Sequence, residues 1–397
     1  MTNLGKFLNA HAPDVTLAMF EICCIIGAFS GGIWAVAAIA GGLVLAASVW
    51  YLDNAFPMPD KGVAGLALGS LGVMALMNVF STHPAVSWSE LLRMATIFIP
   101  LSFWSSPAVR DRALTARLIN ILPASVAAGA ALLSLELLLH GPIMHLFMGP
   151  KARLEEYNRG LSYLVVLSLP VMAYLWTTGR REAAVAFGLF MLLPASLTDS
   201  RASKLGLALA APVVIAAIYR PRLVRDCLAS LAVALTTWPI VAQWVFLHSS
   251  GVFNLIPASW RDRVEIWDFM SYRILEHPWV GWGLGTSRFL RFQEPHGSLY
   301  RYTHANPGHP HNVVTQLWVE LGLPGVALGL IFALVSLNWT FGLDRRLAPF
   351  AMGAWIAALC LCLVAYNFWT DSLFSAFMLT GLAFASLQKH LIGGTSG

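Results

Sequence analysis

The sequence predicts an all-α, polytopic membrane protein, and two observations carry this prediction. Of the 397 residues, 57% are hydrophobic and only 11% are charged, and the mean hydropathy is +0.67. One water-soluble core cannot bury so many apolar side chains, so lipid must solvate a large share of them. Apolar runs of about 17 to 25 residues, the length a helix needs to cross ~30 Å of hydrocarbon, also recur along the chain. We therefore expect a helical bundle of about twelve transmembrane helices.

The expected spans follow the apolar runs in order. They are residues 14–30, 32–50, 62–80, 86–104, 115–139, 160–177, 182–197, 203–219, 227–247, 312–341, 349–369 and 372–389. We expect no cleavable signal peptide, because the amino terminus lacks a basic region followed by a short apolar core and a small-residue cleavage site. The first span is therefore expected to remain in the protein.

A polar segment divides the chain into three parts. Residues 1–247 hold nine expected spans, residues 248–311 form a loop without a long apolar run, and residues 312–397 hold three more spans. A loop of this length is expected to fold into short amphipathic helices or a substrate cover, because long structureless connections are uncommon in compact domains. The stretch from Ala258 to Arg273 has apolar residues at helical spacing and is expected to be an amphipathic helix at the membrane interface. For Arg261 and Arg273, an interfacial role with the charge reaching the headgroups is favoured over catalysis.

Short basic connections indicate the orientation, because lysine and arginine collect on the cytoplasmic side. A cytoplasmic amino terminus leaves the following arginines inside: Arg110, Arg112, Arg180, Arg181, Arg220, Arg222, Arg225, Arg345 and Arg346. This orientation leaves both termini in the cytoplasm and the 248–311 loop outside. The loop is itself basic, which departs from the general tendency and indicates a local function.

Motifs for metals and nucleotides are weak. The five cysteines lie in apolar stretches without metal-ligand spacing, so we expect packing residues and no metal site. Gly281, Gly283 and Gly285 resemble a phosphate-binding loop, but no strand precedes them. A tight irregular turn with permissive dihedrals is the favoured interpretation.

Two features leave alternatives open. In Thr198 to Lys204, Ser200 or Asp199 can cap a helix with Arg201 and Lys204 at the interface, or the helix start can bind an anion. Ionisable residues inside expected spans are compatible with a proton-coupled transporter. They are Glu21, Glu90, Arg93, Glu136 and Glu320. Because they form no obvious relay along several helices, a transporter or flippase is the lesser alternative.

The most informative motif is His311-Asn312, nine residues, then Gly322 and Gly325. It resembles the signature of the O-antigen ligase and O-antigen polymerase group of bacterial envelope proteins. Upstream elements match the same group: Thr-Asp-Ser-Arg201, Arg263-Val-Glu-Ile-Trp267 and His277-Pro-Trp-Val-Gly-Trp-Gly-Leu-Gly285. The resemblance covers mainly residues 196–330. The Gly322 and Pro324 positions also predict a break in the helix that His311 begins, so that this helix lines a cavity rather than lipid.

The resemblance implies glycan transfer from undecaprenyl-pyrophosphate to a lipid A-core sugar at the periplasmic face of a bacterial inner membrane. The alternative is a polymerase that extends carrier-linked repeats. Arg201 and Arg263 match the positions that stabilise the pyrophosphate leaving group, and His311 matches the general base, with an ordinary pKa near ~6.5. No metal, cofactor or nucleic acid is expected. Further substrate-binding candidates are Arg288, Arg291, Lys204, Asn312 and His309.

His309 is a competing candidate base, because it lies two residues from His311. If His311 begins a helix, His309 lies in the preceding loop and is not expected to share its face. The alternative role for His311 is an interfacial helix cap together with Asn312. The motif favours catalysis.

Overall fold

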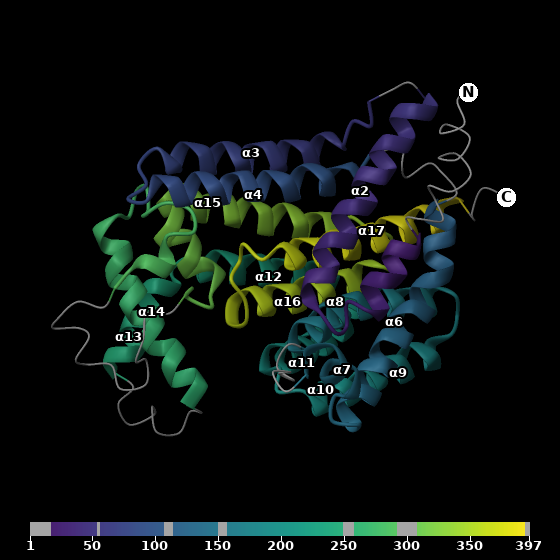
Figure 1. Ribbon diagram of the computed structural model, residues 1–397. Helices are drawn as coiled ribbons and strands as arrows, with labels where there is room; N and C mark the ends of the chain where they lie inside the picture. The colour runs from purple at the N-terminus through teal and green to yellow at the C-terminus, as the bar shows by residue number, and fades with distance from the viewer. Residues whose placement is uncertain are drawn as a thin grey trace.

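The structure, a computed structural model, describes residues 17–53, 56–106, 114–149, 157–248, 258–291 and 308–393. In these ranges all regular structure is helical, which confirms the all-α class (Figure 1). The principal helices are α2 (Gly31–Asp53), α3 (Lys61–Asn78), α4 (Pro84–Phe103), α6 (Leu114–Leu138), α7 (Pro142–Met148), α8 (Tyr157–Thr177), α9 (Arg181–Phe190), α10 (Leu192–Leu197), α11 (Arg201–Tyr219), α12 (Pro221–Leu235), α13 (Trp238–His248), α14 (Ala258–Glu276), the 3-10 helix η4 (Ser287–Phe289), α15 (Val313–Phe341), α16 (Ala348–Val364) and α17 (Asp371–Gly393).

Six of the described helices are long and apolar enough to cross a membrane, and the bent pair α12 and α13 would make a seventh. The protein is therefore polytopic, but the expected number of about twelve spans is not confirmed. The difference has a physical origin in short and interrupted helices. The expected span 182–197 is divided between α9 and α10, and α16 has only 17 residues.

The expected span 227–247 is wrong as a single helix. The chain begins α12 earlier, at Pro221, and bends by 66° after Leu235 before α13 begins. At the bend, the hydroxyls of Thr236 and Thr237 donate to the carbonyls of Val233 and Ala234. These bonds give the backbone carbonyls a partner where the helix ends.

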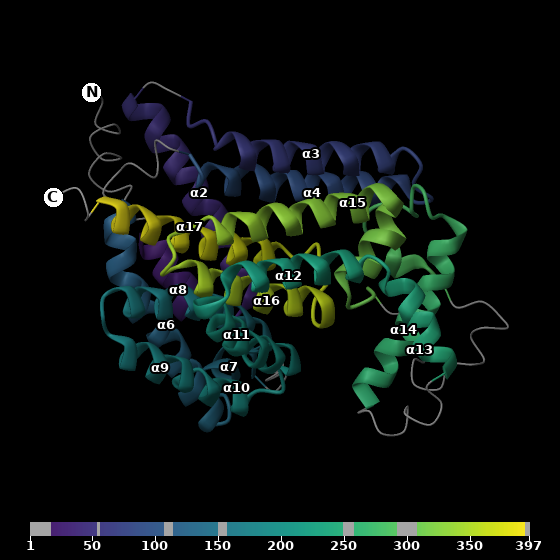
Figure 2. The same cartoon turned by 180° about the vertical axis from the view of Figure 1, so that it is seen from behind.

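After the bend, α13 packs against α14, and the two helices form a lobe beside the main body (Figures 1 and 2). The Ser271 hydroxyl of α14 donates to the carbonyl of Pro239 at the start of α13. The Trp318 indole of α15 donates to the carbonyl of Thr236 in the bend. The bend therefore fixes the lobe on the body.

The helix expected from Ala258 to Arg273 is confirmed as α14, and its place at the membrane interface stays a prediction. Trp267 and Met270 are buried, and so are Glu265 and Asp268. The Arg273 side chain does not reach outward either. It is 7% exposed, donates to Glu276 and to the carbonyl of Arg291, and stacks on Phe269 and Trp282. Arg273 therefore lies inside the lobe and joins α14 to the segment that follows it.

The predicted break in α15 is confirmed, and the segment before it satisfies the freed backbone groups. Gly322 has φ +62° and interrupts the helix two residues before Pro324. Proline has no N–H, so the carbonyl of Glu320 lacks its usual donor four residues on. The Gly283 N–H donates to that carbonyl at 2.9 Å, the Trp282 N–H donates to the carbonyl of Val319, and the Leu323 N–H donates to the carbonyl of Pro278.

The expected glycine turn is likewise confirmed. Gly281, Gly283 and Gly285 have φ of +68°, +108° and +71°. A Cβ on Gly281 would lie 2.5 Å from the Glu320 carbonyl carbon, and one on Gly322 would lie 2.6 Å from that of Trp279. The two backbones thus approach so closely that only glycine fits on either side.

Four of the five cysteines are buried, as expected of packing residues. Cys227 is the exception, because it lies exposed on α12. The expectation was wrong there because α12 turns that position of an apolar segment away from the core.

Candidate active site

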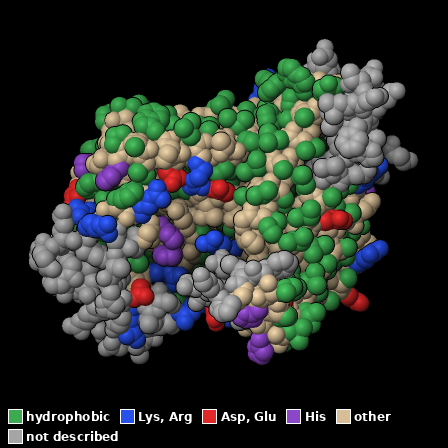
Figure 3. Space-filling view, in the orientation of Figure 1, with side chains coloured by type: hydrophobic (Ala, Val, Ile, Leu, Met, Phe, Trp, Pro, Cys, Tyr) green, Lys and Arg blue, Asp and Glu red, His purple; other side chains and the backbone are tan. Residues whose placement is uncertain are grey.

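The charges of Arg159 and Arg263 both act on His309, whose ring centroid lies 4.0 Å from that of His311, and the charge of Arg201 acts on Arg263. These two histidines and three arginines form one cluster. It is built from the segment before α15 and the first turns of α8 and α11, together with α14. Figure 3 shows histidine and basic side chains gathered in and around a hollow of this face. The cluster unites the three residues that the sequence assigned to catalysis. They are Arg201, Arg263 and His311.

His311 is held in a defined orientation. Its φ is +52°, a left-handed conformation that non-glycine residues adopt rarely and that is often found at functional sites. Its Nδ1 lies 3.2 Å from the carbonyl oxygen of Ala365. A carbonyl can only accept, so Nδ1 carries the proton and Nε2 of the neutral ring keeps its lone pair. Nε2 is therefore the nitrogen able to accept a proton.

Asn312 begins α15 as its N-cap. Its side-chain oxygen accepts from the Thr315 N–H at 3.0 Å, and the residue is only 2% exposed. This is the capping role weighed from the sequence, and it belongs to Asn312 rather than to His311. The cap fixes the start of the helix directly after His311.

His309 lies closer to His311 than its place in the loop suggested. The two ring centroids are 4.0 Å apart, with planes tilted by 47°. His309 Nε2 is buried and has no hydrogen-bond partner among the described residues. The Trp267 indole of α14 donates to the Pro310 carbonyl at 2.8 Å and fixes the segment between the two histidines.

Both histidines are held neutral at neutral pH. Burial lowers the pKa of His309 to about 3, with further lowering by His311, Arg159 and Arg263. Burial also lowers the pKa of His311; the bond to Ala365 opposes this, and the charge of Arg263 adds to it. A neutral imidazole is the form that can accept a proton, so His311 is prepared to act as a base.

The two predicted arginines come from different helices. Arg263 lies on α14 with its guanidinium carbon 5.6 Å from the centre of the Trp260 ring. Burial and the nearby charge of Arg201 lower its pKa from the ordinary value of 12.5. Arg201 is exposed at the first position of α11, where Ser200 caps the helix. The capping interpretation of this segment is confirmed, and it places Arg201 beside Arg263.

A chain of hydroxyl groups ties these parts together. Ser162 of α8 lies 2.8 Å from the Ser203 hydroxyl of α11 and 2.6 Å from the Tyr366 hydroxyl. The Ser203 hydroxyl lies 2.6 Å from that of Ser200, next to Arg201. Tyr366 directly follows Ala365, which holds His311. The bonds therefore link the helix start that carries Arg201 to the loop that orients His311.

The sequence analysis missed one member of the cluster, Arg159 in the first turn of α8. Its side chain is exposed, and its charge is close enough to lower the pKa of His309 and Tyr366. One signal could have revealed it. With a cytoplasmic amino terminus, the expected span 160–177 begins on the external side, where Lys151, Arg153 and Arg159 depart from the positive-inside tendency.

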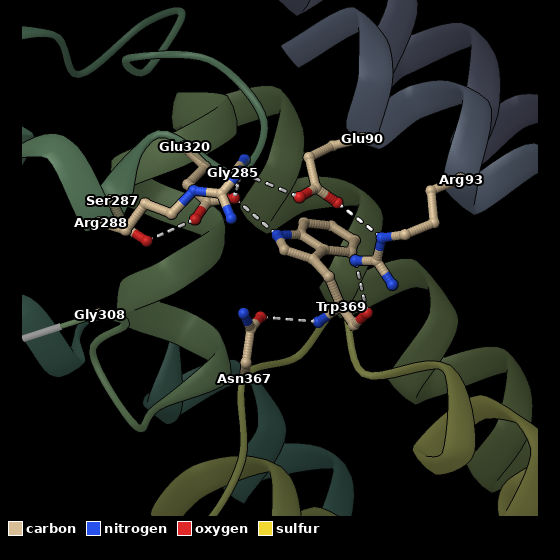
Figure 4. Close-up of a pocket in the computed structure, with 9 residues that line it drawn as sticks. All are labelled: Glu90, Arg93, Gly285, Ser287, Arg288, Gly308, Glu320, Asn367 and Trp369. Carbon is tan, nitrogen blue, oxygen red and sulfur yellow. Dashed lines mark hydrogen bonds and ion pairs between the residues drawn. The ribbon is translucent and has the colours of Figure 1, made fainter. Parts of the chain in front are cut away.

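A small polar pocket lies next to the cluster (Figure 4). It is lined by Glu90, Arg93, Gly285, Ser287, Arg288, Gly308, Glu320, Asn367 and Trp369. Gly308 belongs to the segment that carries the two histidines, and Asn367 follows Ala365 by two residues. The pocket therefore shares two chain segments with the histidine cluster.

Glu320 is the centre of the pocket wall. Its carboxylate is fully buried and accepts from the Gly285 N–H, the Ser287 hydroxyl and the Trp369 indole. Gln316 adds a fourth donor. With four hydrogen-bond donors, the carboxylate joins the glycine turn and the loop after α16 to helix α15. Its place in the wall makes it a structural group rather than part of a proton relay.

The remaining substrate-binding candidates occupy different places. Arg288 lines the pocket, where it pairs with Glu90 at 3.2 Å and lies over the Phe289 ring. Arg291 and Lys204 are exposed, and Lys204 lies three residues beyond Arg201 on α11. Among the described residues, no group of three or more His, Cys, Asp or Glu side chains could hold a metal ion.

The fold and the cluster together describe a polytopic helical membrane protein with a basic, histidine-containing site. Comparison with known proteins shows which family this region resembles. Residues 183–330 match the O-antigen ligase family, which is the family indicated by the motif. This region of the chain, somewhat more than a third of its length, is therefore similar to the O-antigen ligase family.

Relatives in Rickettsia agree with this assignment. A protein of Rickettsia typhi, named as a candidate polysaccharide ligase, is 24% identical over 69% of this chain and 67% of its own length. A relative of the same description in Rickettsia felis is 25% identical over 63% of this chain and 62% of its own length. A third, in Rickettsia prowazekii, is 23% identical over 79% of this chain and 77% of its own length. The match thus spans less than two thirds of the Rickettsia felis protein.

Proposed function

We propose that this protein is an O-antigen ligase. It would transfer a glycan from undecaprenyl-pyrophosphate to a sugar of lipid A-core, at the periplasmic face of the bacterial inner membrane, without a metal ion or cofactor. The observation that carries the proposal is the convergence of Arg201, Arg263 and a neutral, oriented His311 in one hollow. A carrier-linked diphosphate offers a matching anion, and a sugar hydroxyl offers the proton that a base would take.

The chemistry follows from these groups. The acceptor hydroxyl attacks the anomeric carbon of the donor sugar and gives its proton to His311 Nε2. The bond between that carbon and the diphosphate oxygen breaks, and the diphosphate keeps the electron pair. Because negative charge grows on the leaving group, the guanidinium groups of Arg201 and Arg263 stabilise the transition state more than the ground state.

The pocket beside His311 supports a place for the acceptor. Its wall offers carboxylate, guanidinium and amide groups, and Arg288 and Glu90 remain partly accessible. Sugar hydroxyls both donate and accept hydrogen bonds, so such a mixed polar surface suits them. We assign Arg288 and Arg291 to the acceptor side, and Lys204, His309 and Asn312 to the surroundings of the donor and the base.

A polymerase is the second candidate, because it uses the same donor and base and differs only in its acceptor. The lipid-linked material in a deletion strain distinguishes the two. Long carrier-linked polymer would accumulate without a ligase, and single carrier-linked repeats would accumulate without a polymerase. A transporter is disfavoured, because the basic and histidine residues gather in one hollow and the buried Glu320 is saturated by donors.

The roles of the residues are tested with purified protein, a lipid-linked donor and a strong chelator. Transfer should persist in the chelator. His311→Ala should bind donor normally but transfer it ~10²-fold more slowly or worse, the usual scale of a lost general base. Arg201→Ala and Arg263→Ala should lose binding and transfer together, and lysine should substitute poorly because it lacks the planar fork.

Two results would contradict these roles. Normal transfer by His311→Ala, or loss of donor binding in that variant alone, would remove the general-base assignment. Activity lost to the chelator and restored by magnesium would contradict leaving-group stabilisation by arginines alone.

A further inference from the structure

Arg159 is the basic residue of the cluster that none of the sequence motifs includes. The stem of its side chain crosses the start of α2, where a Cβ on Gly31 would lie 3.1 Å from Arg159 Cδ and 3.2 Å from its Cβ. The side chain beyond this contact is exposed. Because Gly31 has no side chain, the aliphatic part of the Arg159 side chain can pack directly against the backbone of α2.

The turn that carries Arg159 is hydrogen-bonded on both sides to Tyr366, which directly follows the Ala365 that contacts His311. The carbonyl of Asn158, the preceding residue, accepts from the Tyr366 hydroxyl at 3.2 Å. Ser162, three residues on, contacts the hydroxyls of both Tyr366 and Ser203. Because these bonds lie on both sides of the residue within one helical turn, the backbone of Arg159 is held at a fixed place, where its charge acts on His309.

Within the part of the chain that the structure describes, the groups on which the charge of Arg159 acts are a histidine and two tyrosines. None of the ion pairs among the described residues involves it. Its nearest titratable partners include His309, Tyr163 and Tyr366. Asp371 is the carboxylate that faces the same group of tyrosines, and it pairs with Arg93. The guanidinium groups of α8 and α14 thus both act on His309, and that of α11 acts on the guanidinium of α14.

Like charges brought together raise the free energy of the empty site, and an anion of more than one charge relieves this cost. We propose that Arg159 is a third arginine of the anion site and contacts the diphosphate of the lipid-linked donor. This inference rests on the proposed function and extends it. With guanidinium groups on three helices, the site can engage both phosphates of the diphosphate, whereas a monophosphate can use only part of it.

The test uses the full chain in detergent and two probes, a short polyprenyl diphosphate and the matching polyprenyl monophosphate. Arg159→Met keeps the aliphatic stem against Gly31 and removes only the charge. Its Kd for the diphosphate should rise about tenfold or more, with a smaller change for the monophosphate. The dependence of diphosphate affinity on salt concentration should also become shallower, because one charge contact is lost.

Arg159→Gln should show the same changes. Arg181→Met is the matched control, because Arg181 is an exposed arginine on α9 that lies over Trp176. It should leave both affinities and the salt dependence unchanged. A purely structural role for Arg159 would lower stability without changing the diphosphate preference or the salt dependence.

The outcomes separate the inference from the proposed function. If Arg201→Met weakens diphosphate binding while Arg159→Met and Arg159→Gln do not, the role of Arg159 is overturned and the proposed function stands. If the unmodified protein shows no preference for diphosphate over monophosphate, both are overturned. Loss of diphosphate preference in both Arg159 variants, with retained folding, supports the role.

Discussion

At the scale of single residues, the orientation of His311 decides what the site can do. The carbonyl of Ala365 fixes which ring nitrogen is basic, the left-handed backbone sets the direction of the ring, and Asn312 fixes the helix that follows. The sequence identified His311, Arg201 and Arg263 through motifs. It could not identify the partner of His311, because Ala365 is an apolar residue 54 positions away. Arg159 was missed for another reason, because it lies outside the motif region.

The pKa of His311 predicts how transfer depends on pH. Burial lowers this pKa below the ordinary value of about 6.5. A base works in its deprotonated form, so transfer should be constant near pH 7 and decline only on acidification to pH values below about 6.5. The rate of transfer under saturating donor, measured from pH 8 to pH 5, checks this expectation.

Donor binding over the same range is the control. Arg201 and Arg263 stay charged throughout, so affinity should change much less than the rate. A rate that instead rises on acidification would mean that the protonated ring is the active form. His311 would then be a phosphate contact.

At the scale of elements, the break in α15 and the glycine turn are one structure. The sequence predicted a helix break from Gly322 and Pro324 and a tight turn from Gly281 to Gly285. Each prediction used local backbone chemistry and each is confirmed. Their mutual fit could not be predicted, because the backbone bonds from residues 278–283 to the break join segments about forty residues apart. The bend between α12 and α13 also escaped prediction, because the apolar run continues through it.

Gly322→Ala tests this fit. The new Cβ would lie 2.6 Å from the carbonyl carbon of Trp279, at a φ that L-residues rarely adopt. We expect a loss of stability of roughly 2 kcal/mol or more, seen as a clear fall in the apparent melting temperature. Transfer should fall as well, because Glu320, the glycine turn and the pocket depend on this contact.

Gly342→Ala is the matched control on the same helix. There a Cβ would lie 3.4 Å from its nearest neighbour, and φ is −75°. This variant should melt within about a degree or two of the unmodified protein. Equal stability of both variants would show that the close approach at Gly322 is not a constraint.

At the scale of the whole molecule, two independent arguments point to the same face. The positive-inside tendency places the starts of α8, α11, α15 and α17, with the loop before α14, on the external side. The structure gathers elements of these same segments around the cluster and the adjacent pocket. The grouping of these segments agrees with one common side, and the external position of that side stays a prediction. The number of spans could not be fixed from runs of apolar residues. Short, bent and divided helices produce similar runs.

The orientation itself is tested by chemical labelling. In a Cys227→Ser background, a cysteine replaces either Trp279 or Arg346. Trp279 is 70% exposed beside the glycine turn, and Arg346 lies exposed between α15 and α16. The other four cysteines are buried, so the background should react little.

A maleimide that crosses the outer membrane but not the inner membrane should label Trp279→Cys in intact cells. It should label Arg346→Cys only after the inner membrane is permeabilised. Denatured samples control for the presence of each cysteine. The reverse pattern would place the cluster in the cytoplasm and would contradict the proposed transfer at the periplasmic face.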